Sequence, residues 1–315
     1  MATTVVAPSY GGPEVLVVIE EEVGPPGPGE VLVDVRAVGT NPIDVKLFSG
    51  RMGRDPGQLP LHLGSEASGV VVEAAPGSIG PAGPITIGDE VMVFRAPGAY
   101  TSRLIAPASS VIPKPPTLTF EEASGLLLTG STAVHALKVT AVGPGDTIVF
   151  HGASGGVGLM AVQLAVLAGA RVIGTASESH HEALRQLGAE PVAYGPGLLE
   201  RLEALAPDGL DAAIDGIGTD EAVDVSLALV PDRERIATIV ATPRSFELGL
   251  KVLGGAPGAD PGTDIRAAAR LELAALAATG QLVVLVAATY PLTEATAALE
   301  LLAQGHTHGK IILVP

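Results

Sequence analysis

The stretch His151–Met160, HGASGGVGLM, decides the fold that this sequence predicts. It follows the apolar run DTIVF and leads into the helical run AVQLAVLAGA. Glycine loses more backbone freedom on folding than any other residue, so a loop this rich in glycine needs a reason. Set against the pattern G-x-G-x-x-G, the loop offers Ala153, Gly155 and Gly158 between a strand and a helix.

In that context the middle glycine lets the backbone approach a pyrophosphate, and the helix N-terminus offers N–H groups and partial positive charge. The alternative is a tight strand-to-helix turn that holds no ligand. A Walker-type loop is excluded because no Gly-Lys-Ser/Thr follows. We therefore predict a dinucleotide-binding loop made of Ala153, Ser154, Gly155, Gly156, Val157 and Gly158.

The end of the next strand, RVIGTAS, bears on which dinucleotide is bound. A site that prefers NAD would carry Asp or Glu there to bind the ribose 2′-hydroxyl, but this chain has Ala176 and Ser177. His181 and Arg185 follow and suit a 2′-phosphate, whereas Glu178 argues against one. The alternative is an ordinary helix start with a serine N-cap. The pattern favours NADP(H) as the cofactor.

The rest of the chain divides into regions with different sequence patterns. Short apolar runs separated by Gly and Pro fill the N-terminal third and indicate a β domain of barrel or sandwich type. Strand and helix then alternate, as in βαβ units on a parallel sheet. The C-terminal tail is too short for a domain of its own. We expect an α/β protein with a discontinuous β domain, 1–118 and 262–315, around a Rossmann domain, 119–261.

Composition narrows the classes of partner. A formal net charge of −16 makes nucleic acid or an anionic membrane a poor partner. The chain has no cysteine, which excludes disulfides, thiolate catalysis and thiolate-bound zinc. No apolar run approaches the ~18 residues of a membrane span, and the first residues lack the pattern of a signal peptide. A cytoplasmic protein is expected.

Three motifs in order, VGTNPIDVKLFSG, GPGDTIVFHGASGGVGLMAVQLA and GHTHGKIILVP, carry a family resemblance. Over essentially its whole length the chain resembles the zinc-independent quinone oxidoreductase (zeta-crystallin-like) branch of the medium-chain dehydrogenase/reductase superfamily. The resemblance implies a partly open, GroES-like β-barrel catalytic domain interrupted by a Rossmann domain, with the active site between them. Asn41 and Ser65 stand where zinc-dependent members hold ligands, so no metal site is expected.

The resemblance also implies catalytic residues. Asn41 and Asp44 match the family's cleft motif, although Asn41 before a proline also suits a turn and Asp44 also suits a helix cap. Lys46 stands where quinone reductases often have tyrosine, as in relatives that reduce enones and alkenals. Its ammonium either faces the cofactor ribose or the reacting oxygen, or it is a surface group. His62 either touches substrate or is solvated.

For the cofactor, the resemblance places Thr132 near the nicotinamide, Tyr194 near the adenosine phosphate and Lys310 near the pyrophosphate. Tyr194 is otherwise a half-buried strand residue, and Lys310 a solvated strand start. Val240 completes the predicted cofactor-binding set.

Together these residues predict NADPH-dependent, metal-free hydride transfer to a quinone or to the C=C bond of an α,β-unsaturated carbonyl. Asn41 and Lys46 are the candidate donors to the oxygen on which charge develops. A catalytically silent NADPH-binding sensor or structural protein is the alternative, and a zinc alcohol dehydrogenase is a distant third. The run QLVVLVAATY, 281–290, predicts a strand, which either pairs across a homodimer, as we expect, or lies inside the fold.

Overall fold

A computed structural model of the chain describes residues 1–305 and 307–315. The chain folds into two compact units, and each is described separately below. Unit 1 comprises Met1–Leu128 and Arg270–Pro315, and unit 2 comprises Thr129–Ala269.

Unit 1 is built on a seven-stranded sheet in the order β10-β8-β5-β3-β18-β17, with β9 also paired to β3. The start of β3 pairs with β9 and its end pairs with β18, while bulges interrupt its ladder with β5. Bulges bend and twist a strand, which lets the sheet curl into a partly open barrel. Two smaller sheets, β2-β1-β4 and β6-β7, complete the strands of unit 1. The strands of the unit are β1 (Ala2–Ala7), β2 (Val17–Glu21), β3 (Glu30–Gly39), β4 (Leu61–His62), β5 (Glu66–Ala74), β6 (Ile79–Gly80), β7 (Gly83–Pro84), β8 (Glu90–Phe94), β9 (Arg103–Pro107), β10 (Val111–Pro113), β17 (Val286–Pro291) and β18 (Lys310–Val314).

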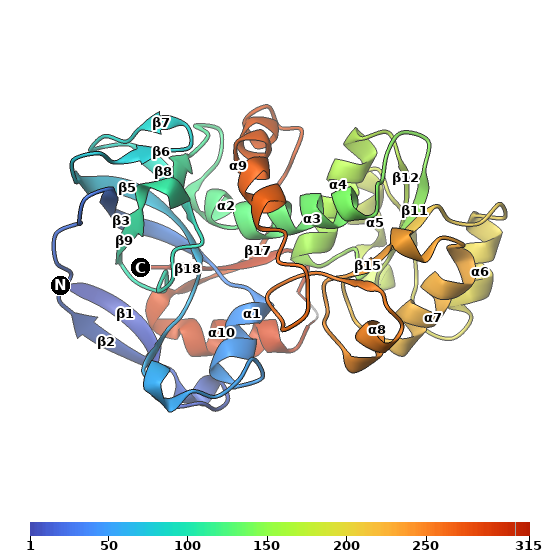
Figure 1. Cartoon of the computed structure of the whole chain (residues 1–315), viewed down its shortest axis with the longest axis horizontal. Helices are drawn as coiled ribbons and strands as arrows, with labels where there is room; N and C mark the ends of the chain where they lie inside the picture. The colour runs from blue at the N-terminus through green and yellow to red at the C-terminus, as the bar shows by residue number, and fades with distance from the viewer. Residues whose placement is uncertain (306) are drawn as a thin grey trace. The chain divides into compact units, whose positions relative to one another are not determined.

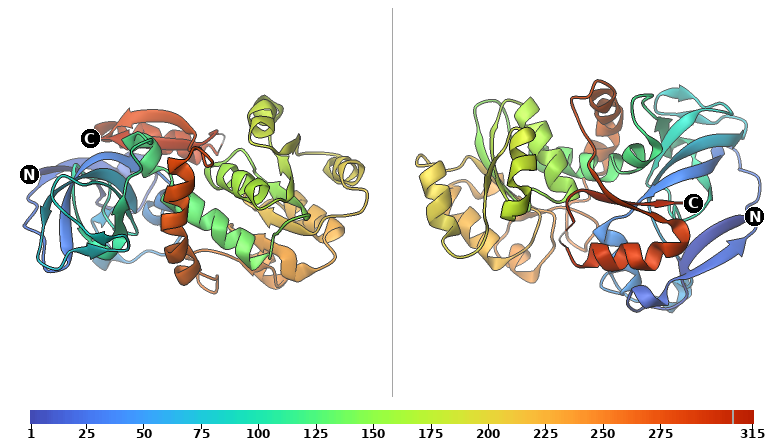
Figure 2. Two further views of the ribbon diagram at one scale, coloured as in Figure 1. Left: turned by 90° about the horizontal axis from the view of Figure 1, so that it is seen from above. Right: turned by 180° about the vertical axis from the view of Figure 1, so that it is seen from behind.

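The C-terminal tail completes this unit. The red strand β18 runs antiparallel to β3, beside the blue N-terminal strands (Figures 1 and 2). Leu299, Ile311 and Leu313 of the tail are buried in one core with Val33, Val93 and other residues of the N-terminal strands. The helices are α1 (Pro42–Phe48), α2 (Phe120–Ser124) and α10 (Ala295–Ala303), while α3 (Leu127–Val139) and α9 (Thr263–Ala278) each cross from one unit to the other.

Unit 2 is a six-stranded sheet in the order β13-β12-β11-β14-β15-β16, and every pair in it is parallel. This is the doubly wound order 3-2-1-4-5-6, whose direction reverses between β11 and β14. Ligands of such sheets bind outside the carboxyl ends of the strands at that switch point. The elements are β11 (Thr147–His151), α4 (Gly156–Leu167), β12 (Arg171–Thr175), α5 (His181–Gln186), β13 (Glu190–Val192), α6 (Leu198–Leu205), β14 (Ala212–Asp215), α7 (Asp220–Leu229), β15 (Ile236–Thr238), α8 (Pro243–Glu247) and β16 (Lys251–Val252).

The predicted fold class, a discontinuous GroES-like β domain with a parallel Rossmann sheet, is confirmed. Three local features differ from expectation. The segment 119–128, expected in the Rossmann domain, lies in unit 1 because α2 packs against β3 and β5. The segment 262–269, expected in the β domain, belongs to unit 2. The strand expected over 281–290 begins only at Val286, because its one ladder partner, β18, begins opposite it at Lys310.

Candidate functional site

The glycine loop joins β11 to α4 at the switch point of the unit 2 sheet. Gly152 has φ +78°, a left-handed conformation that favours glycine. Gly155 is the N-cap of α4, which begins at Gly156. A Cβ on Gly158 would lie 2.5 Å from the carbonyl oxygen of Gly152, so only glycine lets the helix pack this close to the loop. The buried Ala153 fits where the fingerprint has its first glycine, because Gly174 beside it has no side chain.

The loop fits a dinucleotide pyrophosphate. The N–H groups of Gly156 and Val157 begin a twelve-residue helix and have no intrahelical acceptor. They carry the positive end of the helix dipole. A Cβ on Gly155 would meet only one atom within 4 Å, the carbonyl oxygen of Gly152 at 3.5 Å, so the backbone there is open to an approaching group.

A row of polar residues closes the carboxyl ends of the four central strands, in register across the sheet: Thr175, His151, Asp215 and Thr238. His151 Nε2 lies 3.2 Å from the Ser226 hydroxyl. Asp215 accepts from the N–H groups that follow β14 and from the Thr238 hydroxyl at 2.9 Å. Burial lowers the pKa of His151 to about 4, against the opposing charge of Asp215. His151 is therefore a neutral, fixed part of the floor beneath the glycine loop.

The residues after β12 form a small polar group. The Ser177 hydroxyl lies 3.0 Å from the Ser179 hydroxyl and 3.0 Å from His180 Nδ1. His181 Nε2 lies 3.3 Å from the Ala176 carbonyl oxygen. Arg185 is exposed and pairs with Glu182. Ser177, His181 and Arg185 thus come from adjoining turns at one strand end, and their contact with a 2′-phosphate stays a prediction.

Tyr194 is 57% exposed, so it is not the half-buried strand residue of the alternative interpretation. Arg201 of α6 fixes its loop by donating to the carbonyl oxygens of Ala193, Gly195 and Pro196.

Two further residues of the predicted cofactor set lie in unit 2. Val240 packs against Gly218, where a Cβ would lie 2.9 Å from Val240 Cβ. Thr132 is 6% exposed within α3. The structure places both, while their contacts with a cofactor stay predictions.

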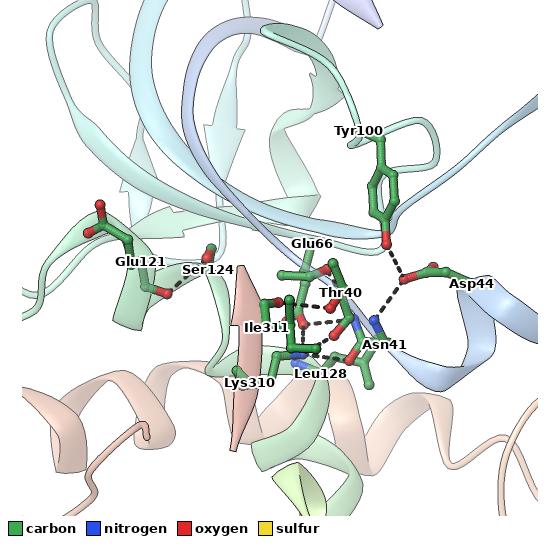
Figure 3. A network of polar contacts seen from close by, with 11 residues as sticks. Thr40, Asn41, Asp44, Glu66, Tyr100, Glu121, Ser124, Leu128, Lys310 and Ile311 are labelled. Atoms are coloured by element: carbon green, nitrogen blue, oxygen red, sulfur yellow. Dashed lines mark hydrogen bonds and ion pairs between the residues drawn. The ribbon is translucent and has the colours of Figure 1, made fainter. Parts of the chain in front are cut away.

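In unit 1 a buried polar network surrounds Asn41 (Figure 3). Lys310 Nζ donates to the Thr40 carbonyl oxygen at 2.7 Å, Asn41 Oδ1 at 2.7 Å and Glu66 Oε1 at 2.9 Å. Asn41 Nδ2 donates to Glu66 Oε1 at 3.0 Å and to the Gly39 carbonyl oxygen at 3.3 Å. Lys310 is 4% exposed and is therefore not a solvated strand start. These contacts use every donor of both groups within unit 1.

Asp44 extends the network to α1. Its Oδ2 accepts from the Asn41 N–H at 2.8 Å and from the Tyr100 hydroxyl at 2.9 Å, as the dashed lines of Figure 3 mark. Burial raises the pKa of Asp44 to about 6, although both hydrogen bonds oppose the shift. Burial and the neighbouring Asp44 raise the pKa of Tyr100 well above its usual range. Asp44, the third residue of α1, therefore takes part in capping that helix, the alternative interpretation of its motif.

Lys46 and His62 differ from these buried groups. Lys46 lies half-buried on α1, and its ammonium has no hydrogen-bond or ion-pair partner in the part of the chain that the structure describes. His62 pairs with Glu21 at 3.3 Å across exposed strands. Of the residues predicted near the reaction, only Lys46 keeps an uncommitted donor.

Sequence reasoning missed Glu66, Tyr100, His151 and Asp215. Glu66 follows Ser65 directly in GSEASG, so a charge at the start of an apolar strand was an available signal. His151 and Asp215 end the apolar runs TIVFH and AAID. The rule that parallel sheets bind ligands at their carboxyl ends singles out both positions.

Comparisons with known proteins agree with this architecture. A family model described as an alcohol dehydrogenase GroES-like domain matches residues 27–116, and one described as a zinc-binding dehydrogenase matches residues 187–313. The 2-haloacrylate reductase of a Burkholderia species is 33% identical over 337 residues, covering 100% of this chain and 99% of that protein. The chain belongs to the medium-chain dehydrogenase/reductase superfamily.

Within that superfamily its relatives include quinone oxidoreductases. Escherichia coli quinone oxidoreductase, solved in complex with NADPH, superposes with a TM-score of 0.85 at 29% identity, covering 99% of this chain and 100% of that one. The mouse synaptic vesicle membrane protein VAT-1 homolog is 35% identical over 197 residues, which is 61% of this chain and 47% of that protein. The match therefore spans about half of that relative's length.

The described residues include no group of three His, Asp or Glu side chains that could hold a metal ion. None of the helices within residues 1–305 and 307–315 is long and apolar enough to span a membrane.

Proposed function

We propose that the chain is an NADPH-dependent oxidoreductase that transfers hydride, without a metal ion, to a quinone or to the C=C bond of an α,β-unsaturated carbonyl. The observation that carries the proposal is the glycine loop, which opens the first turn of α4 at the switch point of a doubly wound sheet. Bound NADPH supplies a hydride from its nicotinamide ring to an electrophilic carbon.

The chain's own residues would bind and orient the reactants. Backbone N–H groups at Gly156 and Val157 hold the pyrophosphate. Ser177, His181 and Arg185 hold the 2′-phosphate, and Thr132, Tyr194 and Val240 line the remainder of the cofactor site. Lys46 donates to the oxygen on which charge develops, because Asn41 already uses both of its amide hydrogens.

The Asn41 site supports the metal-free part of the proposal. In the zinc-dependent members of the superfamily, that position supplies a ligand to a dication. Here Asn41 Oδ1 accepts from the Lys310 ammonium at 2.7 Å. A cation bound to the same oxygen would be repelled by that buried charge.

The test is NADPH oxidation, followed by absorbance, against a panel of benzoquinones, naphthoquinones, enones and 2-haloacrylates, with and without a chelator. Turnover with NADPH exceeding that with NADH, and unchanged by chelation, is expected. The panel includes both quinones and activated C=C compounds because the relatives include quinone oxidoreductases and a 2-haloacrylate reductase. Thermal stabilisation by NADPH without turnover on any acceptor would instead identify a silent binding protein. Stoichiometric zinc in active protein would favour the alcohol dehydrogenase alternative.

A variant pair separates the cofactor site from the fold. Gly155→Ala adds a methyl where the backbone is open and φ is −77°, so the fold tolerates it while the pyrophosphate does not. We expect the KM for NADPH to rise at least about tenfold, which corresponds to ~1.4 kcal/mol. Gly143→Ala, at a turn where a Cβ meets nothing within 4 Å, is the control. Equal KM values in both variants would refute the proposed loop contact.

The proposal includes a homodimer in the cytoplasm. Light scattering of the purified protein tests the dimer, and a monomer at micromolar concentration would exclude it.

A further inference from the structure

Glu66, the first residue of β5, is a buried carboxylate with no role in the function proposed above. It is 1% exposed. Its Oε1 accepts from both Asn41 Nδ2 and Lys310 Nζ, and its Oε2 accepts from the Leu128 N–H at 2.9 Å (Figure 3). One side chain thus joins β5, the loop before α1, the strand β18 and the first turn of α3.

The charges in this group dictate which way the Asn41 carboxamide points. An ammonium only donates, so the Asn41 atom that faces Lys310 is the oxygen. An ionised carboxylate only accepts, so the atom that faces Glu66 is the nitrogen. In the reversed amide, the Asn41 NH₂ group would face the Lys310 ammonium, where both only donate, and the Asn41 oxygen would face the Glu66 carboxylate, where both only accept. The pair therefore permits one orientation, whereas two neutral partners would permit both.

Asn41 transmits that orientation to α1. It is the N-cap residue, its N–H binds Asp44, and the preceding carbonyl oxygen, that of Thr40, binds Lys310. Lys46 lies on this seven-residue helix, which packs Val45 and Phe48 against the unit 1 core. The polar contacts that fix the start of the helix, and with it the direction of the Lys46 side chain, converge on Glu66.

We propose that Glu66 is a positioning residue for hydride transfer: it locks the Asn41 carboxamide and the start of α1, and thereby places Lys46 against the reacting oxygen. The kinetic part of this inference rests on the proposed function. The orientation of Asn41 does not, and it can be measured without turnover.

Asn41 is the only asparagine in the chain, which makes the measurement direct. Cell-free synthesis with amide-¹⁵N asparagine yields a protein with one labelled side-chain NH₂ group. In the wild type, we expect two separate proton signals that exchange slowly with solvent, because both hydrogens are bonded and buried. In Glu66→Gln, Lys310 still holds the Asn41 oxygen, so the two signals should stay separate, but the loss of the charged acceptor should make solvent exchange at least tenfold faster.

The kinetic readout uses the same variant at saturating NADPH. Glu66→Gln should lower kcat by roughly 10- to 100-fold, the cost of misplacing a reacting group by about an ångström. In Lys46→Gln background the same change should have less than a twofold effect, because Glu66 acts through Lys46. The control is Glu90→Gln, which removes the carboxylate partner of another buried lysine, Lys114, and should leave kcat within twofold.

Loss of the buried countercharge could unfold Glu66→Gln, so a charge-balanced variant is also needed. Glu66→Gln combined with Lys310→Gln removes both charges and should fold, yet stay slow. Its Asn41 signals should split into two populations, because two neutral partners permit both amide orientations. Wild-type kcat in this double variant would overturn the proposal, since charge balance alone would then suffice. Unchanged solvent exchange of the Asn41 signals in Glu66→Gln, or a single Asn41 orientation in the double variant, would overturn it as well. If the wild-type protein shows no turnover, the proposed function fails, while the Asn41 signals still decide the role of Glu66.

Discussion

Removing the imidazole of His151 should change how the stability of the Rossmann unit responds to acid. His151 ends β11, is 1% exposed and has a pKa lowered to about 4 by burial. The Ser226 hydroxyl donates to the Ala222 carbonyl oxygen, so it can only accept from His151, which fixes the neutral imidazole with its proton on Nε2. A second proton would charge a ring that water does not reach.

The magnitude follows from linkage. The ordinary pKa of histidine is 6.5, so between pH 6.5 and pH 4 the unfolded chain binds a proton that the folded chain refuses. The stabilisation is complete above pH 6.5 and is lost as the pH falls toward 4. Two and a half pKa units correspond to about 3 kcal/mol, which is a large part of a domain's stability.

His151→Gln keeps a donor for Ser226 but cannot titrate. The assay is urea unfolding followed by far-ultraviolet circular dichroism at pH 4, 5, 6 and 7. The wild type should lose about 3 kcal/mol more than the variant between pH 7 and pH 4. His62→Gln, at an exposed position, should follow the wild type. Parallel pH curves for wild type and His151→Gln would refute a neutral, buried imidazole.

Three other perturbations test separate parts of the structure. Because the pKa of Asp44 is raised to about 6, ionising its carboxylate destabilises the folded chain as the pH rises from about 4 to 6. Between pH 4 and pH 7, the free energy of unfolding of Asp44→Asn, measured with urea, should rise by about 3 kcal/mol relative to that of the wild type. Parallel pH curves for the two proteins would exclude this. Gly158→Ala should destabilise by about 1–3 kcal/mol, because its Cβ lies 2.5 Å from a carbonyl oxygen, whereas Gly143→Ala should not; equal midpoints of thermal unfolding would contradict the close packing. Leu299→Ala, in the core that the tail shares with the N-terminal strands, should lower the free energy of unfolding by about 2–5 kcal/mol, and Leu271→Ala, at an exposed position, by less than about 1 kcal/mol.

The architecture could be predicted largely from local patterns. The run from DTIVF through the glycine loop to its helix predicts β11 and α4 because each element has its own periodicity and punctuation. The spacing of Thr119 and Glu122 is that of a capping box, and the two residues form one at the start of α2, with hydrogen bonds in both directions. The short helix α1 was foreseen only as an alternative for Asp44, since its seven residues are too few to establish a helical period.

For the candidate site too, local features could be predicted from the sequence and long-range contacts could not. The sequence determined the glycine loop, the replacement of an acid by Ala176 and Ser177 directly after β12, and the lack of cysteine ligands, because each depends on neighbouring residues or on composition alone. Only the tertiary structure decided that Asn41 is bonded to Glu66 and Lys310, which lie 25 and 269 positions away in the chain. No spacing rule relates residues so distant, because their contact depends on the register in which β18 joins β3. Both amide hydrogens of the buried Asn41 are used in hydrogen bonds, whereas the ammonium of Lys46 forms none with the residues that the structure describes. This difference could not be predicted from the sequence, because it depends on which side chains the fold buries together.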